Sequence, residues 1–319
     1  MKKESKIYVA GHRGLVGSAL VRNLRDKGFK NLVLRTHDEL ELHDQAAVQA
    51  FFAEEKPEYV ILAAAKVGGI YANNAYPAEF IYDNLIIQSN VIHSAWQNNV
   101  SRLLFLGSSC IYPKECPQPM KEDYFLTGIL EPTNRPYALA KIAGIEMCHA
   151  YNRQYGTKYL AVMPTNLYGP GDNYDLNNSH VLPALLRKVH EAKQNNVGEV
   201  VVWGSGAPKR EFLYCDEMAD ACVYLLENID KGLPGLFNDV RPPLVNIGCG
   251  EDLTIRELAE TITDVVGYQG KLVFDASKPD GTMRKLLDVS RMQSLGWKAS
   301  VSLREGIGKT YKSYLETLK

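Results

Sequence analysis

The chain has 319 residues, of which 45% are hydrophobic and 23% charged, and its formal net charge is −1. That length suits one large α/β unit with a smaller attached lobe. The near-neutral charge argues against a general nucleic-acid binder, which needs a basic face. No apolar stretch has the length of a membrane span or the flanks of a signal peptide, so we expect a cytoplasmic protein without a membrane partner. The six cysteines are scattered without a C-x-x-C pair, which predicts neither a disulfide framework nor a metal site.

Strand-like apolar runs alternate with helical segments through the first half of the chain. Strands are expected at residues 7–10, 32–35, 59–62, 103–106 and 159–162, and helices at 18–27, 46–55, 77–98 and 134–155. Near-continuous apolar strands that alternate with helices are typical of a parallel sheet covered on both faces. The pattern therefore predicts a Rossmann-type, doubly wound α/β fold with ligands at the carboxyl ends of its strands.

The character of the chain changes after Asn166, because residues 168–180 are rich in Gly, Asn, Asp and Pro and predict a loop. The later elements are expected as a helix over 182–194, a strand over 200–203, a basic loop ending at Arg210, a strand over 244–247 that returns to the main sheet, a helix over 255–266 and a Pro/Gly turn over 278–281. We therefore expect a Rossmann domain over 1–167, rejoined by about 214–248, and a smaller carboxyl-terminal α/β lobe made mainly from 168–319.

Residues 77–98 predict a long helix with two apolar stripes. The stripes are Ile81, Leu85, Ile92 and Trp96 on one side, and Phe80, Ile87 and Val91 on the other. A helix that contacts only one sheet needs a single stripe, so this helix is expected to have a second packing partner. That partner is either another subunit or a further part of the same chain.

A glycine-rich turn follows the first strand and opens the first helix. It consists of Gly11, His12, Arg13, Gly14, Leu15, Val16 and Gly17. In a dinucleotide-binding turn the first glycine permits the tight turn, the next lets the backbone approach a pyrophosphate, and the last lets helix and strand pack closely. The helix start presents free N–H groups to the phosphates. The position of this turn at the first strand–helix junction predicts a dinucleotide cofactor.

The residues at the end of the second strand bear on the choice of cofactor. The dinucleotide fingerprint has an acid there, about 20 residues after the turn, which holds a ribose 2′-hydroxyl. This chain has Arg35 and His37 in that place and Arg13 within the turn. Cations suit a 2′-phosphate, which predicts NADP(H). The alternative is that Arg13 and Arg35 are solvated surface charges.

Tyr137 and Lys141 lie four residues apart and therefore share one face of a helix. A phenol with a pKa of about 10 is a poor base at neutral pH, and a nearby ammonium lowers that pKa. Ser108 follows the fourth strand, where a ligand at the top of the sheet would lie. Together the three side chains predict a triad that polarises a carbonyl and transfers a proton, although a tyrosine–lysine pair alone is also common on helix surfaces.

On these features the chain resembles the extended short-chain dehydrogenases/reductases that act on nucleotide sugars. The resemblance narrows to the members that convert GDP-4-keto-6-deoxy-D-mannose to GDP-L-fucose, by 3,5-epimerisation and NADPH-dependent reduction at C4. Six segments carry it across nearly the whole chain: AGHRGLVG at 10–17, AAAKVGGIYAN at 63–73, LGSSCIYPK at 106–114, EPTNRPYALAKIAG at 131–144, PTNLYG at 164–169 and DASKPDGTMR at 275–284.

The loop after the fourth strand distinguishes related chemistries. Nucleotide-sugar 4,6-dehydratases carry an Asp-Glu pair beside the hydroxyl residue, whereas here Ser108 is followed by Ser109 and Cys110. A thiol exchanges protons beside a ketone when its environment lowers its pKa of about 8.5. The resemblance implies that Cys110 and His180 are the two proton carriers that invert C3 and C5, and an imidazole suits that work near neutral pH.

The resemblance also implies further roles. Tyr137 would donate the proton at C4, Ser108 would bond the oxygen, and Lys141 would orient the nicotinamide ribose. Contacts with the cofactor are implied for Leu106, Gly107, Lys141, Pro164, Asn166, Leu167 and His180, and contacts with the GDP-sugar for Lys188, Trp203, Arg210 and Asp280. One departure is His37, where the family is expected to have an arginine. The preference for NADP(H) would then rest on Arg13 and Arg35.

Two other functions are compatible with the sequence. A non-catalytic Rossmann sensor would typically lack the tyrosine or the lysine of the triad, and this chain keeps both. A reductase that acts only at C4 of a related GDP-4-keto sugar, such as a heptose, would be able to retain Cys110 and His180 without using them. The resemblance further implies a homodimer packed through the helix over 77–98 and the helix that carries Tyr137 and Lys141.

Overall fold

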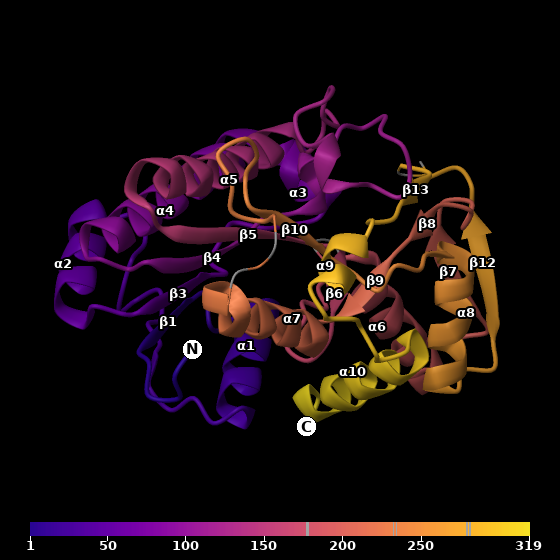
Figure 1. Ribbon diagram of the computed structural model, residues 1–319. Coiled ribbons are helices and arrows are strands. Elements are labelled where there is room, and N and C mark those ends of the chain that lie inside the picture. Colours follow the sequence, from indigo (N-terminus) through magenta and orange to yellow (C-terminus); the bar gives the residue numbers. More distant parts are fainter. Residues whose placement is uncertain (177–178, 232, 234, 279, 281) are drawn as a thin grey trace.

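The computed structural model describes residues 1–319 except 177–178, 232, 234, 279 and 281, and except the side chains of residues 70 and 71. The loop predicted over 168–180 and the turn predicted over 278–281 therefore lie partly outside the described residues. Figure 1 shows two lobes, with the amino-terminal part of the chain in the larger one.

A six-stranded parallel sheet forms the centre of the larger lobe, in the order β10-β5-β4-β3-β1-β2. Its strands are β1 (Ile7–Ala10), β2 (Leu32–Val33), β3 (Tyr59–Leu62), β4 (Arg102–Leu106), β5 (Lys158–Pro164) and β10 (Leu244–Ile247). The predicted Rossmann-type α/β fold is confirmed. The last strand in sequence, β10, pairs with β5 at the edge of the sheet, so the chain returns to this lobe after leaving it.

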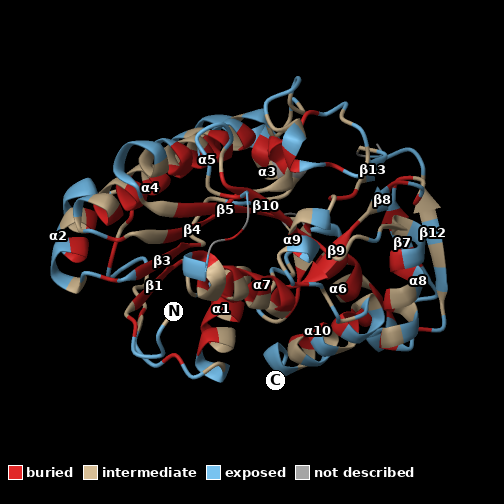
Figure 2. Cartoon of the chain, in the orientation of Figure 1, coloured by how far each residue is buried: buried red, intermediate tan, exposed pale blue. Residues whose placement is uncertain are grey.

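Helices cover both faces of this sheet (Figure 1). They are α1 (Leu15–Asp26) and α7 (Cys215–Asn228) on one face, and α2 (Gln45–Glu55), α4 (Pro77–Gln97) and α5 (Arg135–Tyr155) on the other. Successive side chains of a strand point to opposite faces, so Val9 packs on the α1 side and Tyr8 on the α2 side. Since both faces are buried, most strand residues are apolar, and Figure 2 colours much of the strands as buried.

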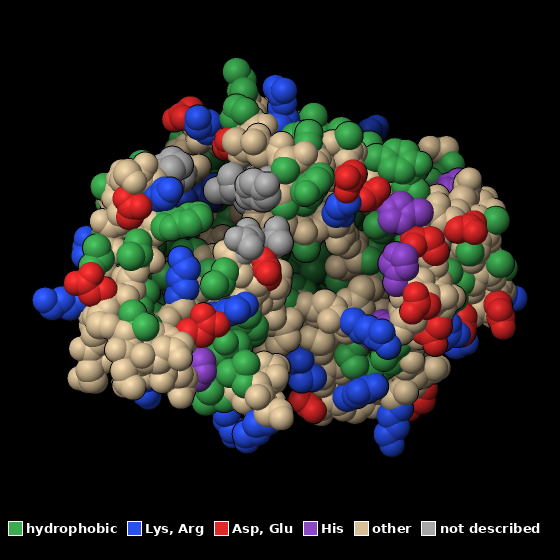
Figure 3. All heavy atoms as spheres, turned by 180° about the vertical axis from the view of Figure 1, so that it is seen from behind, with side chains coloured by type: hydrophobic (Ala, Val, Ile, Leu, Met, Phe, Trp, Pro, Cys, Tyr) green, Lys and Arg blue, Asp and Glu red, His purple; other side chains and the backbone are tan. Residues whose placement is uncertain are grey.

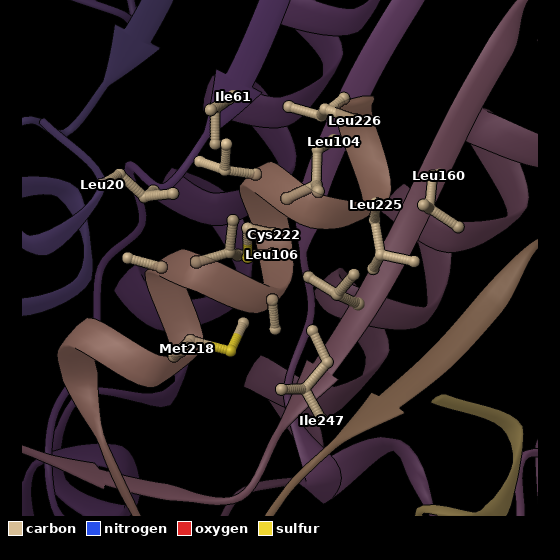
Figure 4. Packing of buried hydrophobic residues seen from close by; sticks show 14 of the residues in the cluster. Leu20, Ile61, Leu104, Leu106, Leu160, Met218, Cys222, Leu225, Leu226 and Ile247 are labelled. Carbon is tan, nitrogen blue, oxygen red and sulfur yellow. The ribbon is translucent and has the colours of Figure 1, made fainter. Parts of the chain in front are cut away.

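Residues 215–228, for which no separate element is predicted above, form the buried helix α7. Figure 4 shows how this helix lies against the sheet, with Met218, Cys222, Leu225 and Leu226 facing Leu104, Leu106, Leu160 and Ile247. Burial of a side chain of this size contributes roughly 1.5–3 kcal/mol. The helix therefore closes the α1 face of the sheet, although it comes from the second half of the chain.

The smaller lobe has its own apolar core, formed mainly by α6 (Val181–Gln194), α8 (Ile255–Val266) and α10 (Leu303–Thr317). Three small sheets, β6–β9, β7–β12 and β11–β8–β13, accompany these helices. Their strands are β6 (Asn166–Tyr168), β7 (Glu199–Trp203), β8 (Lys209–Arg210), β9 (Phe212–Tyr214), β11 (Leu253–Thr254), β12 (Lys271–Asp275) and β13 (Arg284–Lys285). Strands of two or three residues carry no periodic pattern, which is why most of them are absent from the predicted elements.

The remaining short helices are α3 (Ile70–Ala75), α9 (Ser290–Ser294), η1 (Ser109–Ile111), η2 (Glu122–Tyr124) and η3 (Ile229–Lys231). No helix in the described part of the chain combines the length and the apolar character that crossing a membrane requires. Figure 3, seen from behind, shows acidic and basic side chains interspersed over the surface, as the small net charge indicates.

The long helix α4 lies against both α2 and α5. Phe80, Ile87 and Val91, which form one predicted stripe, are buried. In the other stripe Ile92 is buried, whereas Leu85 and Trp96 are only partly buried. A second packing partner therefore exists within the chain, and part of the second stripe still reaches the surface.

Candidate active site

The glycine turn after β1 makes the close contacts that a dinucleotide-binding turn requires. Gly11 has φ +82°, and a Cβ there would lie 2.7 Å from the backbone nitrogen of Ala64. A Cβ on Gly17 would lie 2.0 Å from the carbonyl oxygen of Gly11. Since neither position accommodates a side chain, the passage from β1 to α1 requires glycine at both.

Protein packing does not explain the glycine at position 14. A Cβ there would meet only the Gly11 carbonyl oxygen, at an ordinary distance of 3.5 Å. Gly14 is the N-cap of α1 and provides no side-chain cap, so it leaves the N–H groups of the first turn for another partner. The Nδ1 atom of His12 in the same turn is buried without a hydrogen-bond partner among the described residues. Bare backbone next to uncapped N–H groups fits the pyrophosphate of a dinucleotide.

The three cations predicted to favour NADP(H) have different surroundings. Arg35 forms an ion pair with Glu55 of α2. His37 Nε2 lies 2.8 Å from Glu41 Oε2, and its side chain is 78% exposed. Arg13 is exposed, and no described carboxylate lies within ion-pair distance of its guanidinium. Of the three, Arg13 is therefore the best placed to meet a 2′-phosphate.

The structure brings Ser108, Tyr137 and Lys141 together. Ser108 follows β4 and is the N-cap of η1, where its Oγ accepts a hydrogen bond of 3.4 Å from the Cys110 backbone nitrogen. The Ser108 side chain also lowers the pKa of both the Tyr137 phenol and the Cys110 thiol. Tyr137 and Lys141 lie one turn apart on α5, with the Lys141 ammonium 5.7 Å from the centroid of the Tyr137 ring.

Lys141 is only 2% exposed, and its Nζ donates a hydrogen bond of 2.9 Å to the carbonyl oxygen of Leu106. Burial lowers the pKa of Lys141 to about 8, and the negative charge of a Cys110 thiolate acts in the opposite direction. An ammonium has three donors. The two that the Leu106 carbonyl does not use suit a ribose hydroxyl, which is the role predicted for this lysine.

Tyr137 differs from one expectation. A nearby ammonium is predicted above to lower the pKa of the phenol, but burial raises the pKa of Tyr137 instead, and the charge of Cys110 raises it further. The hydrogen bond from Ser108 acts in the opposite direction and is the smaller effect. The Lys141 ammonium is not among the groups that shift the pKa of Tyr137. The phenol is therefore protonated at neutral pH, which is the form that donates a proton.

Cys110 is buried next to Ser108. Burial raises the pKa of its thiol, whereas the hydrogen bond with Ser108 and the ammonium groups of Lys285 and Lys141 lower it. His180 is the N-cap of α6, and desolvation lowers the pKa of its imidazole, which is therefore neutral and able to accept a proton at pH 7. Within the described parts of the chain, no hydrogen bond joins His180 to the group around Ser108.

The other residues predicted to contact the cofactor lie where β4 and β5 end and β6 begins. Leu106 is the last residue of β4, Pro164 the last of β5, and Asn166 and Leu167 belong to β6. A Cβ on Gly107 would lie 2.1 Å from Cε of Met163, so this position is closely packed. Because β1, β4 and β5 are parallel, these residues share the edge of the sheet that carries the glycine turn.

The four residues predicted to contact the GDP-sugar come together from separate elements of the smaller lobe. Lys188 of α6 has its Nζ 5.2 Å from the ring centroid of Trp203, which ends β7 and is 66% exposed. Asp280 accepts hydrogen bonds from the backbone nitrogen and the Oγ of Ser205, at 3.0 and 2.7 Å. Burial lowers the pKa of Arg210 in β8, and the charge of Asp280 raises it. This arrangement joins an exposed aromatic ring with cations that suit a diphosphate.

Two further charged residues near the site are absent from the predicted set. Lys285 of β13 is paired in register with Arg210 of β8. Glu211 is completely buried, and its two carboxylate oxygens accept hydrogen bonds from the Gly250 and Leu287 nitrogens, at 2.7 and 3.0 Å. Both positions depend on segments far apart in the sequence. The sequence offers one indication of Lys285, since this residue directly follows the segment 275–284, which carries the family resemblance.

Comparisons with known proteins identify relatives over almost the whole chain. The model of the NAD dependent epimerase/dehydratase family matches residues 7–248. The chain is 60% identical over 318 residues to a putative GDP-L-fucose synthase 2 of Arabidopsis thaliana, with 100% of this chain and 94% of that protein covered. It is 58% identical to the GDP-L-fucose synthase of Escherichia coli strain K12, with 98% and 97% covered.

A solved structure supports the same relationship. The chain is similar to a GDP-mannoheptose C4 reductase from Campylobacter jejuni with NADP bound, with a TM-score of 0.89, 45% identity and 99% of both chains covered. The family model and the two relatives together cover the glycine turn, the triad and the smaller lobe. The chain therefore belongs to the NAD-dependent epimerase/dehydratase family and, within it, to the GDP-L-fucose synthases.

Proposed function

We propose that this chain converts GDP-4-keto-6-deoxy-D-mannose to GDP-L-fucose, by epimerising C3 and C5 and reducing C4 at one site. The observation that carries the proposal is that Ser108, Cys110 and Tyr137 lie together at one site, where the Ser108 oxygen accepts a hydrogen bond from the Cys110 backbone and the Ser108 side chain lowers the pKa of both the phenol and the thiol. Reduction of a ketone needs a proton donor such as the tyrosine. The thiol adds an acid–base group suited to the carbons beside that ketone.

In the epimerisation, the C4 ketone acidifies the hydrogens at C3 and C5. Cys110 removes such a proton as a thiolate, and the electron pair of the C–H bond moves into an enolate conjugated with C4. His180 is the second proton carrier: its imidazolium form returns a proton to the carbon from the opposite face of the sugar, which inverts the centre, and it thereby becomes the neutral imidazole that its lowered pKa favours. Ser108 binds the C4 oxygen, where the negative charge of the enolate develops.

NADPH, when bound, supplies the hydride for C4. The glycine turn with the N-terminus of α1 would hold its pyrophosphate, and Arg13 its 2′-phosphate. Tyr137 donates a proton to the C4 oxygen, because burial keeps its phenol protonated at neutral pH. Lys141 orients the nicotinamide ribose from its position on the Leu106 carbonyl.

Incubation of the chain with GDP-4-keto-6-deoxy-D-mannose in D2O without NADPH tests the epimerase activity. NMR is expected to show deuterium at C3 and C5. Cys110→Ser and His180→Asn are each expected to impair this exchange, and Cys110→Ser to leave the affinity for NADPH unchanged. Tyr137→Phe is expected to retain exchange and to lose about 100-fold or more in reduction. An absence of deuterium with the parent chain would leave a C4 reductase of a related GDP-4-keto sugar, such as a heptose.

We infer a preference for NADPH over NADH that rests mainly on Arg13, because Arg35 and His37 already have carboxylate partners. Arg13→Ala is expected to raise KM for NADPH about tenfold, as the loss of one charge-assisted contact implies, and to leave KM for NADH unchanged. Equal kcat/KM for the two cofactors with the parent chain would contradict this inference.

We also propose a homodimer formed through α4 and α5. The support is a cluster of aromatic side chains at the surface of these two helices, in which Trp96 and Tyr155 stack with ring centroids 4.2 Å apart. Tyr155 is 44% exposed, although its ring is apolar.

We further propose two domains with different roles. Residues 1–167 with about 214–248 would bind the cofactor, and a lobe made mainly from 168–319 would bind the substrate. The support is that the two lobes have separate apolar cores.

A further inference from the structure

A cavity beside Cys110 is shared by the loop after β4 and by the strand β13. Its lining includes Cys110, Glu131, Asn134, Arg284 and Lys285. These residues belong to segments that are far apart in the sequence, so their position around one cavity is a product of the tertiary structure.

Two hydrogen bonds hold Leu286, the residue after β13, against the loop that follows Cys110. The Met120 nitrogen donates to the Leu286 carbonyl oxygen at 2.7 Å, and the Leu286 nitrogen donates to Gln118 Oε1 at 2.9 Å. On its other side β13 is paired with β8, where Lys285 lies opposite Arg210. Lys285 is therefore fixed from both sides at the boundary between the two lobes.

The charge of Lys285 is poorly compensated in this position. No described carboxylate lies within ion-pair distance of its ammonium, and burial lowers its pKa. Cys110, Glu131 and Cys116 favour the ammonium when they are negative, whereas Arg210 disfavours it, and Cys110 has the largest of these effects. A desolvated cation is stable only next to a negative partner, and the Cys110 sulfur is the strongest candidate.

The surroundings of Cys110 also point to Lys285 as its partner. The Ser108 side chain of the same loop and the ammonium groups of Lys141 on α5 and Lys285 on β13 all lower the pKa of the Cys110 thiol, and its own charge acts on Tyr137 of α5. Cys110 and Lys285 line the same cavity. Of the two ammonium groups, Lys285 has the larger effect on the thiol, and Lys141 is bound to the Leu106 carbonyl. The Lys285 side chain makes no hydrogen bond to another described residue, so its ammonium donors are available within the cavity that it shares with Cys110.

We propose that Lys285 is a positioning residue for the epimerisation, whose ammonium is the counter-ion that holds the Cys110 thiolate at the sugar carbon. In the step itself the sulfur takes the proton, the electron pair of the C–H bond moves into the enolate, and Lys285 keeps its own proton throughout. The inference rests on the function proposed above, because it concerns the same thiol.

Titration of Cys110 without any sugar tests the proposal directly. The rate of alkylation by iodoacetamide is measured against pH, and the contribution of Cys110 is the difference between each variant and the same variant carrying Cys110→Ser. Lys285→Met is expected to raise the pKa of Cys110 by about one unit, as the loss of an adjacent opposite charge implies, and therefore to reduce alkylation at neutral pH about tenfold. Lys285→Arg keeps the charge and is expected to titrate like the parent chain.

Lys278→Met is the matched control. Lys278 comes from the segment just before β13, but its Nζ lies 5.6 Å from the ring centroid of Trp203 rather than at the thiol. The Cys110 titration is expected to be unchanged in this variant. A general effect of removing a lysine from this segment would shift both variants equally and would overturn the proposal.

Deuterium exchange at C3 and C5 supplies the functional measurement. Lys285→Met is expected to exchange about tenfold more slowly than the parent chain at neutral pH. Its exchange rate should approach the parent rate as the pH rises, because the thiolate then forms without the counter-ion. Lys285→Arg is expected to retain exchange. An unchanged Cys110 titration in Lys285→Met, together with weaker binding of GDP, would overturn the proposal and assign Lys285 to the diphosphate beside Arg210. A shifted Cys110 titration in Lys285→Met supports the counter-ion role whatever the exchange experiment shows. An absence of deuterium exchange with the parent chain would refute the proposed function but not the counter-ion role.

Discussion

Lys141, Tyr137 and Cys110 form one desolvated cluster around Ser108. Burial favours the neutral form of each group. It therefore lowers the pKa of the Lys141 ammonium and raises the pKa of the Tyr137 phenol and of the Cys110 thiol. The individual residue types therefore do not determine the chemistry by their ordinary pKa values. The balance between burial and the few nearby charges decides which residue donates a proton and which needs a counter-ion before it accepts one.

The buried charge of Lys141 is expected to make stability depend on pH. The pKa of Lys141 is about 8 in the folded chain and about 10.4 when unfolded, so between these values the unfolded chain binds more protons and stability rises with pH. Relative to Lys141→Met, the parent chain should gain about 2.5 kcal/mol between pH 8 and 10.5. Urea unfolding of both proteins at several pH values measures this difference. A difference that does not change with pH would contradict the shift.

At the scale of elements, the β1–α1 turn contains two kinds of glycine: those that packing requires and one that packing does not explain. Gly11 and Gly17 are required because a Cβ at either would clash with backbone. Gly14 has room for a methyl group, and its value is expected to appear only when a pyrophosphate approaches the N-terminus of α1.

Alanine substitutions distinguish these two roles. Gly14→Ala is expected to fold with a loss of stability of no more than about 1 kcal/mol, as alanine at an N-cap implies, and to bind NADPH at least about tenfold more weakly. Gly17→Ala is expected to lose both stability and binding, because its Cβ would lie 2.0 Å from the Gly11 carbonyl oxygen. Thermal unfolding and titration of NADPH fluorescence measure the two properties. Unchanged NADPH binding in Gly14→Ala would exclude a close approach of the cofactor there.

The helix α7 illustrates how an element from the second half of the chain stabilises the cofactor sheet. Leu225 is completely buried against the sheet (Figure 4), so Leu225→Ala is expected to lower the free energy of unfolding by about 2–5 kcal/mol. Leu318→Ala removes the same atoms from a side chain that is 56% exposed, and a change below about 0.5 kcal/mol is expected. Urea unfolding measures both, and similar values for the two variants would contradict the packing of α7.

At the scale of the whole molecule, buried polar contacts join the two lobes. The backbone carbonyl oxygen of Glu211 accepts hydrogen bonds from Thr165 Oγ1 and Asn166 Nδ2, at 3.1 and 2.8 Å. Its carboxylate accepts from Gly250 and Leu287, which follow β10 and β13. One residue thus connects the end of the cofactor sheet with the segments that carry Arg210 and Lys285, so the two halves of the proposed site are positioned relative to each other.

The proposed homodimer is tested by a charge placed on the aromatic surface of α5. Light scattering of the parent chain is expected to give the mass of a dimer, and Tyr155→Glu to give that of a monomer, because the carboxylate would be desolvated at the interface. Val240→Glu places the same charge on a side chain that is 84% exposed elsewhere and is expected to remain dimeric. A monomeric parent chain would refute the proposal.

Local pattern was sufficient for much of this protein. The alternation of apolar strands and helices predicts the parallel sheet, which is confirmed, and the glycine turn, Ser108 and the Tyr137–Lys141 spacing predict the residues on which the proposed function rests. These features are local because a strand, a turn and a helix face each depend on residues that are close together in the chain.

Only the tertiary structure decided the rest. It placed Lys285 and Cys110 in the lining of one cavity, packed α7 under the cofactor sheet, and enclosed Tyr137 so that its pKa rises where the sequence predicts a fall. It also placed Glu55 in an ion pair with Arg35 and left Arg13 without a described carboxylate partner. The physical reason is common to these cases: burial and charge pairing depend on contacts between segments far apart in the sequence, which no local pattern contains.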